Sequence, residues 1–186
     1  MKLDIRITGS GGQGAITAGH ILGSAAVLYD KKEAVVTEGY SPYVTGGWSR
    51  ADIVLSDEPI DYPMVSKLDA LMTMFQDGLD TNLGLLKKKS VVVAEKKLVD
   101  VSKAKERSVV LIPAIDVAES LGRKMVANIV LLGSLAGVFP IISIESLKTA
   151  VSNRFPKAAV LNVKALEAGY DLAQRALKTQ GGGIPA

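Results

Sequence analysis

The chain has 186 residues, enough for one domain with a full hydrophobic core. Its 22 Lys and Arg residues stand against 19 Asp and Glu residues, and a net charge of +3 is too small to indicate a nucleic-acid or anionic-membrane partner. The lack of cysteine excludes disulfides, thiolate zinc sites and cysteine-ligated iron–sulfur clusters on this chain. With a single histidine, His20, we expect no catalytic residue and no metal ligand.

No signal peptide and no membrane span are expected. Met1 and Lys2 run directly into a short charged strand, and the most hydrophobic stretch, residues 129–142, is interrupted by Pro140. A cytoplasmic location is therefore the expectation.

Short apolar runs alternate with helical or loop segments along the first two thirds of the chain. The first predicted helix covers residues 15–29, and the predicted strands cover residues 2–8, 34–37, 51–56, 68–74, 90–94 and 108–113. Such runs are typical of a central, mainly parallel sheet covered on both faces. The fold class is therefore predicted as α/β, a three-layer Rossmann-like fold.

The last third is predicted to be helical. The predicted helices cover residues 115–121, 125–138 and 144–153, and a last one begins at residue 158 or 163 and ends at residue 178. Ser143 is a plausible N-cap for the helix over residues 144–153. No linker or repeat divides the chain, so residues 1–178 are expected to form one domain. The glycine-rich residues 179–186 are expected to be a flexible tail.

A glycine-rich turn joins the first strand to the first helix. Gly9 could make a tight turn, Gly11 could let the backbone approach a ligand, and Gly14 could permit close helix–sheet contact. The following helix directs unpaired N–H groups at the same place, which favours a phosphate or carboxylate. Gly12 and Gln13 complete this candidate binding turn; the Gln13 amide either bonds a ligand or partner, or only caps the turn.

A second unusual segment, residues 38–50, follows the second predicted strand at the end where open α/β sheets bind ligands. Gly46 and Gly47 offer another close backbone approach, and tyrosines and the only tryptophan add apolar surface with polar tips. We expect either a ligand pocket or an interface here. Asn128, before an apolar run, either bonds a ligand or caps its own helix.

Four further polar residues have simpler interpretations. His20 is expected to be a packed or partly exposed helix residue, and Glu38 a loop or interface residue. Asp116 follows a strand end and is interpreted as a helix-start residue. For Arg50, a phosphate or carboxylate partner and a surface or interface pair are equally supported.

The chain resembles the gamma subunit of 2-oxoacid:ferredoxin oxidoreductases, the pyruvate/2-oxoglutarate ferredoxin oxidoreductase gamma-subunit domain family. The Gly-Gly-Gln-Gly core at Gly11 to Gly14 is more specific than a general dinucleotide fingerprint. The matching blocks follow one another over almost the whole chain: residues 9–14 with 18–19 and 23–26, residues 40–47 with 51–60, residues 128–133, and Asn162 with residues 168–170.

This resemblance implies an enzyme complex that decarboxylates a 2-oxoacid on thiamine diphosphate, reduces ferredoxin through iron–sulfur clusters and forms an acyl-coenzyme A. The thiamine diphosphate and the clusters would lie in alpha, beta and delta-type partner subunits. This chain would serve assembly and the coenzyme A side of the site, and would be inactive alone. The implied binding residues are Gly9, Gly11, Gly12, Gln13, Gly14, Gly46, Gly47 and Asn128. An isolated subunit would also expose apolar area that favours a homodimer.

The chain departs from the family at two positions. Members often carry an acidic residue and an arginine where this sequence has Tyr43 and Thr45, so a guanidinium and its carboxylate partner are both missing. The departure leaves the choice among 2-oxoacids open. Two other function classes also remain: a free-standing nicotinamide- or flavin-binding oxidoreductase, and a nucleotide-binding scaffold without turnover.

Overall fold

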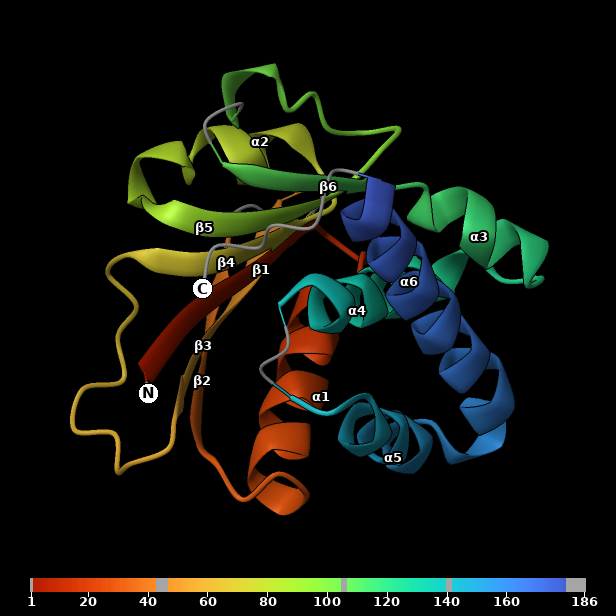
Figure 1. The fold of residues 1–186 in the computed structure, drawn as a ribbon, viewed down its shortest axis with the longest axis horizontal. Coiled ribbons are helices and arrows are strands. Elements are labelled where there is room, and N and C mark those ends of the chain that lie inside the picture. The colour runs from red at the N-terminus through yellow and green to blue at the C-terminus, as the bar shows by residue number, and fades with distance from the viewer. Residues whose placement is uncertain (1, 43–46, 105–106, 140–141, 180–186) are drawn as a thin grey trace.

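A six-stranded sheet forms the middle of the protein, and most of the helices lie on one of its faces (Figure 1). The computed structural model describes residues 2–42, 47–104, 107–139 and 142–179. Gly46, Tyr43 and Thr45 lie outside the described residues, as does the expected tail beyond Thr179. The strands are β1 (Lys2–Ser10), β2 (Glu33–Tyr40), β3 (Trp48–Ser56), β4 (Leu68–Thr73), β5 (Leu86–Glu95) and β6 (Ser108–Ile112).

The strand order is β2-β3-β1-β4-β5-β6. Strands β1, β4, β5 and β6 run parallel, whereas β3 is antiparallel to both β1 and β2. The predicted α/β class and mainly parallel sheet are confirmed. The prediction of a loop over residues 38–50 was wrong at both ends of that segment. Residues 38–40 continue β2 and residues 48–50 begin β3, so the segment is the end of a hairpin.

The helices agree closely with the predicted segments. They are α1 (Ala15–Leu28), α2 (Gln76–Asp80), α3 (Ala114–Ser120), α4 (Ala127–Val138), α5 (Ile144–Arg154) and α6 (Ala159–Thr179). The predicted cap of α5 is confirmed, because the Ser143 hydroxyl accepts a hydrogen bond from the Ser146 N–H at 3.1 Å. The short α2 was not predicted. None of the helices in the described ranges has the length and apolar character needed to cross a membrane.

The main hydrophobic core lies between the sheet and α1, α4, α5 and α6. Helix α4 is buried along its whole length and packs against α6. A Cβ atom added at Gly133 would lie 1.9 Å from the Leu166 carbonyl oxygen, and one at Gly169 would lie 1.8 Å from the Val130 carbonyl oxygen. The last two sequence blocks therefore meet here, where glycines let two helix backbones touch.

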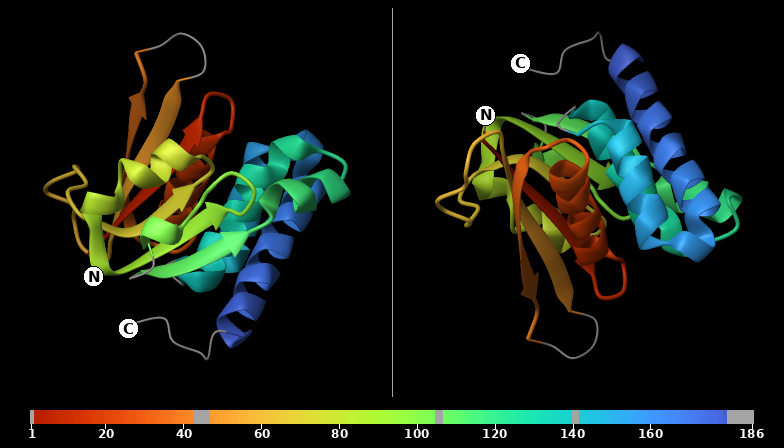
Figure 2. Two further views of the ribbon diagram at one scale, coloured as in Figure 1. Left: turned by 90° about the horizontal axis from the view of Figure 1, so that it is seen from above. Right: turned by 90° about the horizontal axis from the view of Figure 1, so that it is seen from below.

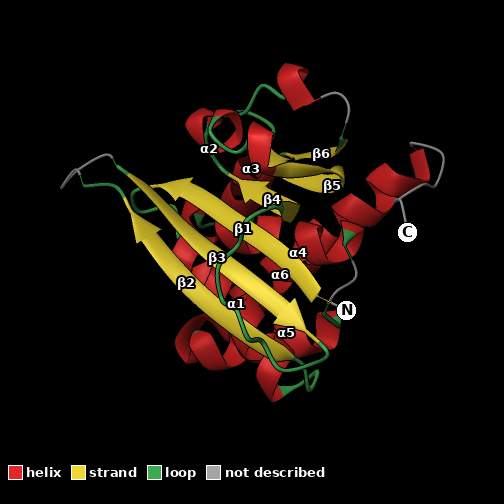
Figure 3. Cartoon of the chain, turned by 90° about the vertical axis from the view of Figure 1, so that its left-hand side faces the viewer, coloured by secondary structure: helices red, strands yellow, loops and turns green. Residues whose placement is uncertain are grey.

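The opposite face of the sheet carries a thinner layer. Helix α2 and short 3₁₀ turns cover β4 and β5 around a small core that includes Leu71, Leu79 and Val92. Among the described residues, no helix covers β2 and β3 on this side, and the connection 57–67 crosses it (Figure 3). The β2–β3 hairpin projects away from the helical layer (Figure 2). The sheet was predicted to be covered on both faces, and this face is covered only in part.

Candidate functional site

The glycine turn, the β2–β3 hairpin and the start of α4 meet at the carboxyl end of β1. The Gly11 N–H donates to the Gly47 carbonyl at 2.7 Å, and the Asn128 side-chain amide donates to the Gly14 carbonyl at 3.1 Å. The Gln13 amide accepts from the Ser10 N–H at 2.7 Å and donates to the Met74 carbonyl at 3.3 Å. The described candidate residues are therefore brought together, from segments more than a hundred residues apart.

The structure corrects the roles expected for Gly9 and Gly14. Gly9 lies within β1, where a Cβ would press on Gln13 and Met74, and it does not form the turn. Gly11 contacts the hairpin through its N–H group and also lines an open hollow, so its close approach to a ligand stays a prediction. Gly14 has φ +75° and leaves room for Asn128, which a Cβ would approach to 2.4 Å; the close helix–sheet contact belongs instead to Gly19, packed on β3.

These contacts decide the intramolecular part of two open interpretations, and a ligand or partner contact of Gln13 or Asn128 stays a prediction. Gln13 caps the turn and also ties it to the end of β4. Asn128 does not cap its own helix, since no side chain caps the start of α4. Instead it holds the α4 start against the glycine turn.

A hollow of about 460 Å³ opens beside the start of α1; we call it the glycine-turn hollow. Its lining includes Gly12, Gly14, Thr17, Tyr40 and Ser41, and no lining residue is acidic or basic. Gly12 has φ +83°, and a Cβ added there would meet no atom within 4 Å. The first turn of α1 holds no acidic residue, and no side-chain hydrogen bond caps it. Its N–H groups are thus available to an anion.

On the other side of the same turn lies a smaller hollow of about 230 Å³, the Glu95 hollow, which Gln13, Glu95, Met125 and Asn128 help to line. Glu95 ends β5 and is 1% exposed. Its carboxylate accepts from the N–H groups of Lys97 and Ile115, both at 3.1 Å, and so ties β5 to the start of α3. Met125, 84% exposed, stands at the rim.

A chain of polar side chains leads from α1 to the glycine-turn hollow. His20 Nε2 lies 2.5 Å from Glu38 Oε1, and the Tyr40 hydroxyl donates to Glu38 Oε2. The Tyr40 hydrogen bond, and then that from His20, hold the pKa of Glu38 below its ordinary value, while Glu38 raises the pKa of Tyr40. The expected partly exposed His20 is confirmed. Asp116 lies in the first turn of α3, as expected, and pairs with Lys97.

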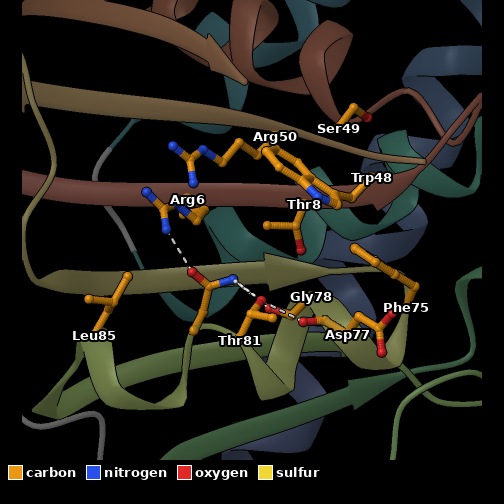
Figure 4. A pocket seen from close by; sticks show the side chains of 11 residues that line it. Arg6, Thr8, Trp48, Ser49, Arg50, Phe75, Asp77, Gly78, Thr81 and Leu85 are labelled. Carbon is orange, nitrogen blue, oxygen red and sulfur yellow. Dashed lines mark hydrogen bonds between the residues drawn. The ribbon is translucent and has the colours of Figure 1, made fainter. Parts of the chain in front are cut away.

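A third cavity, of about 290 Å³, lies on the sheet face opposite α1; we call it the arginine pocket (Figure 4). Arg6 is 5% exposed and forms a bidentate pair with Asp52, with Nε–Oδ1 2.5 Å and Nη2–Oδ2 2.7 Å. Its Nη1 donates to Asn82 Oδ1 at 2.7 Å. Arg50 also reaches Asp52, at 3.5 Å, and stacks over the Trp48 ring with 5.5 Å to the centroid.

Sequence reasoning missed Arg6, Asp52, Asn82 and Glu95. Arg6 and Asp52 are opposite charges within the runs of apolar residues in β1 and β3, and they are direct partners in the β1–β3 register. The charges were visible signals, but the pairing depends on an antiparallel neighbour that the sequence did not reveal. Glu95 was visible as a carboxylate that ends an apolar run. No group of three or more His, Cys, Asp or Glu residues suited to a metal occurs in the described ranges.

The comparisons agree with this architecture. Residues 4–172 match the model of the family described as pyruvate ferredoxin/flavodoxin oxidoreductase. The chain is 42% identical to the 2-oxoglutarate synthase subunit KorC of Methanocaldococcus jannaschii, over 94% of this chain and 95% of the relative.

Two solved structures share the fold. The gamma subunit of a keto/oxoacid ferredoxin oxidoreductase from Geobacter sulfurreducens superposes with a TM-score of 0.83 at 32% identity, covering 95% of this chain and 98% of that one. The 2-oxoglutarate:ferredoxin oxidoreductase of Magnetococcus marinus, solved with 2-oxoglutarate, coenzyme A and succinyl-CoA, has a TM-score of 0.85 at 23% identity and covers 94% of this chain but 31% of that one. The chain therefore belongs to the pyruvate ferredoxin/flavodoxin oxidoreductase family, as a gamma subunit of a 2-oxoacid:ferredoxin oxidoreductase.

Proposed function

We propose that this subunit contributes the coenzyme A side of the active site and helps to assemble the complex. Thiamine diphosphate and the iron–sulfur clusters belong to alpha, beta and delta-type partners in this proposal, which agrees with the absence of cysteine from the sequence. Coenzyme A supplies the thiol that takes up the acyl group. The solved relative from Magnetococcus marinus, crystallised with coenzyme A, supports this assignment.

The observation that carries the proposal is the uncapped start of α1 beside an open glycine. A phosphate of coenzyme A fits there because free N–H groups and the helix dipole favour an anion, and no acidic residue lines the hollow. Thr17, Ser41 and Ser49 add hydroxyl groups to the lining, which could donate to phosphate oxygens. The residues that would hold the anion are Gly12, Gly14 and the first residues of α1.

Replacement of Gly12 by alanine tests this site. We expect the KM for coenzyme A to rise about fivefold to tenfold in the assembled complex, which corresponds to the loss of about one ordinary hydrogen bond, with kcat little changed. The reason is that Gly12 lines the hollow, and a side chain there would disturb a backbone held at positive φ. Steady-state kinetics with varied coenzyme A measures the effect.

Gly122→Ala is the matched control. Gly122 also has positive φ, at +92°, and a Cβ there would also meet nothing within 4 Å, but it follows α3 and lines none of the three cavities described. Both variants carry a similar backbone strain, so only a ligand contact separates them. An unchanged KM in Gly12→Ala, or an equal rise in both variants, would contradict the coenzyme A contact.

We also propose 2-oxoglutarate as the substrate of the complex, on the strength of the relative from Methanocaldococcus jannaschii, a 2-oxoglutarate synthase subunit. The purified complex should show a kcat/KM for 2-oxoglutarate at least about tenfold higher than for pyruvate or 3-methyl-2-oxobutanoate. Ferredoxin reduction with each acid measures this ratio. A preference for pyruvate would refute the substrate assignment and leave the gamma-subunit assignment intact.

The exposed apolar side chains support the role in assembly. Large hydrophobic residues lie exposed at the end of α1, in the connection after β3 and at the Glu95 hollow: Val27, Leu28, Tyr62, Met64, Leu98 and Met125. Partner subunits would cover such surface, and a homodimer of the isolated chain would use the same area.

A further inference from the structure

The arginine pocket is separate from the coenzyme A proposal. It lies on the face of the sheet opposite α1, whereas the glycine-turn hollow lies at the α1 start; Trp48 and Ser49 contribute to both. Arg6, Asn82 and Thr8 are buried at its base. These buried groups are held by hydrogen bonds to one another and to Asp52 and Thr73, so they give the cavity a fixed polar base.

The charges at one end of this pocket do not balance. Two guanidinium groups share one carboxylate. Both oxygens of Asp52 accept hydrogen bonds from Arg6, and one of them also forms an ion pair with Arg50. Asn82 adds only a neutral acceptor. The end formed by Arg6 and Arg50 therefore has a surplus of about one positive charge, and the Arg50 guanidinium makes an ion pair and a ring contact but no hydrogen bond within the described residues.

The Arg50 side chain is held in place rather than free in solvent. Gly39 faces Arg50 across the β2–β3 hairpin, and a Cβ at Gly39 would lie 2.8 Å from Arg50 Nε. The missing side chain lets Arg50 lie across β2, while the Trp48 ring supports its guanidinium. A positioned guanidinium binds a planar carboxylate with little further loss of side-chain freedom.

The rest of the lining restricts what else the ligand can carry. Trp48, Phe75 and Leu85 supply apolar walls, and Asp77 stands at the far side from the two guanidinium groups (Figure 4). A second negative charge at that side would be repelled by Asp77. We propose that the arginine pocket binds a single carboxylate attached to a short apolar body, with Arg50 as the principal contact. The carboxylate belongs either to a free acid or to an acidic side chain of a partner subunit.

Trp48 makes the first test direct, because it is the only tryptophan and lines the pocket. Butanoate titrated into the purified full chain should give a saturable change in tryptophan fluorescence, and uncharged butanamide should give none. Arg50→Gln should weaken the response at least fivefold. Lys157→Gln, which removes the same charge from an exposed position in the 3₁₀ turn just before α6, should leave the response unchanged.

No response to butanoate, an equal response to butanamide, or a response that survives in Arg50→Gln would overturn the proposal. Because Trp48 also borders the glycine-turn hollow, the Arg50 variant shows which cavity holds the acid. The outcome leaves the coenzyme A assignment untouched, since that rests on Gly12 and the KM for coenzyme A.

The second test distinguishes the two sources in the assembled complex. Phenylglyoxal modification of Arg50, followed by mass spectrometry, reports whether its guanidinium is covered. Protection only after butanoate is added identifies a free acid as the ligand, and protection without it identifies a partner's acidic side chain. Arg50 that reacts equally with and without butanoate, in both the complex and the isolated chain, would refute carboxylate binding.

Discussion

Alanine at Gly133 or Gly169 is expected to destabilise the protein by about 3 kcal/mol or more, at the upper end of the range for overpacked cores. A Cβ at either position would overlap a backbone carbonyl of the facing helix, at 1.9 Å and 1.8 Å. Backbone atoms cannot rotate away as a side chain can, so α4 and α6 would have to separate. Helix α4 is buried throughout, and the shift would disturb the main core.

Alanine substitutions at two other glycines serve as controls for this prediction. Gly137 lies on the same interface, but a Cβ there would stop 2.9 Å from the Tyr170 carbonyl oxygen, so a smaller loss is expected. Gly84 has no neighbour within 4 Å and should tolerate alanine. Urea unfolding should rank the variants in that order. A Gly133→Ala protein as stable as Gly84→Ala would show that the helices do not touch as described.

Loss of the Asp52 carboxylate is the second large effect. Asp52→Ala should reduce the free energy of unfolding by about 3–5 kcal/mol, because Arg6 would stay buried with its charge unpaired. By contrast, Asp116→Ala removes a carboxylate whose ion pair with Lys97 is exposed, and only a small loss is expected. Denaturant unfolding of both variants measures the difference.

A double variant tests the cause. Arg6→Met combined with Asp52→Leu removes both charges together and should recover most of the stability lost in Asp52→Ala, since no buried charge is left without a partner. If the double variant were as unstable as Asp52→Ala, the loss would come from packing at these positions and not from an unpaired charge.

The elements and the site differed in how far they could be predicted. Every predicted strand and helix exists, because apolar runs and caps such as Ser143 act over a few residues. The glycine turn was correctly located, yet the roles expected for Gly9 and Gly14 were wrong, since they depend on Met74 and Asn128, which lie far away in the sequence.

The sequence by itself determined the α/β class, the order of the elements, the family resemblance and the location of the glycine turn. Periodicity, glycine at positive φ and absent cysteine are local or compositional properties that need no contact map. Only the tertiary structure decided that β3 runs antiparallel beside β1. That direction places Arg6 opposite Asp52 and brings Arg50 to the same carboxylate. Strand register is set by distant pairing, so the glycine contacts of α4 with α6 and the arginine pocket became visible only in the folded chain.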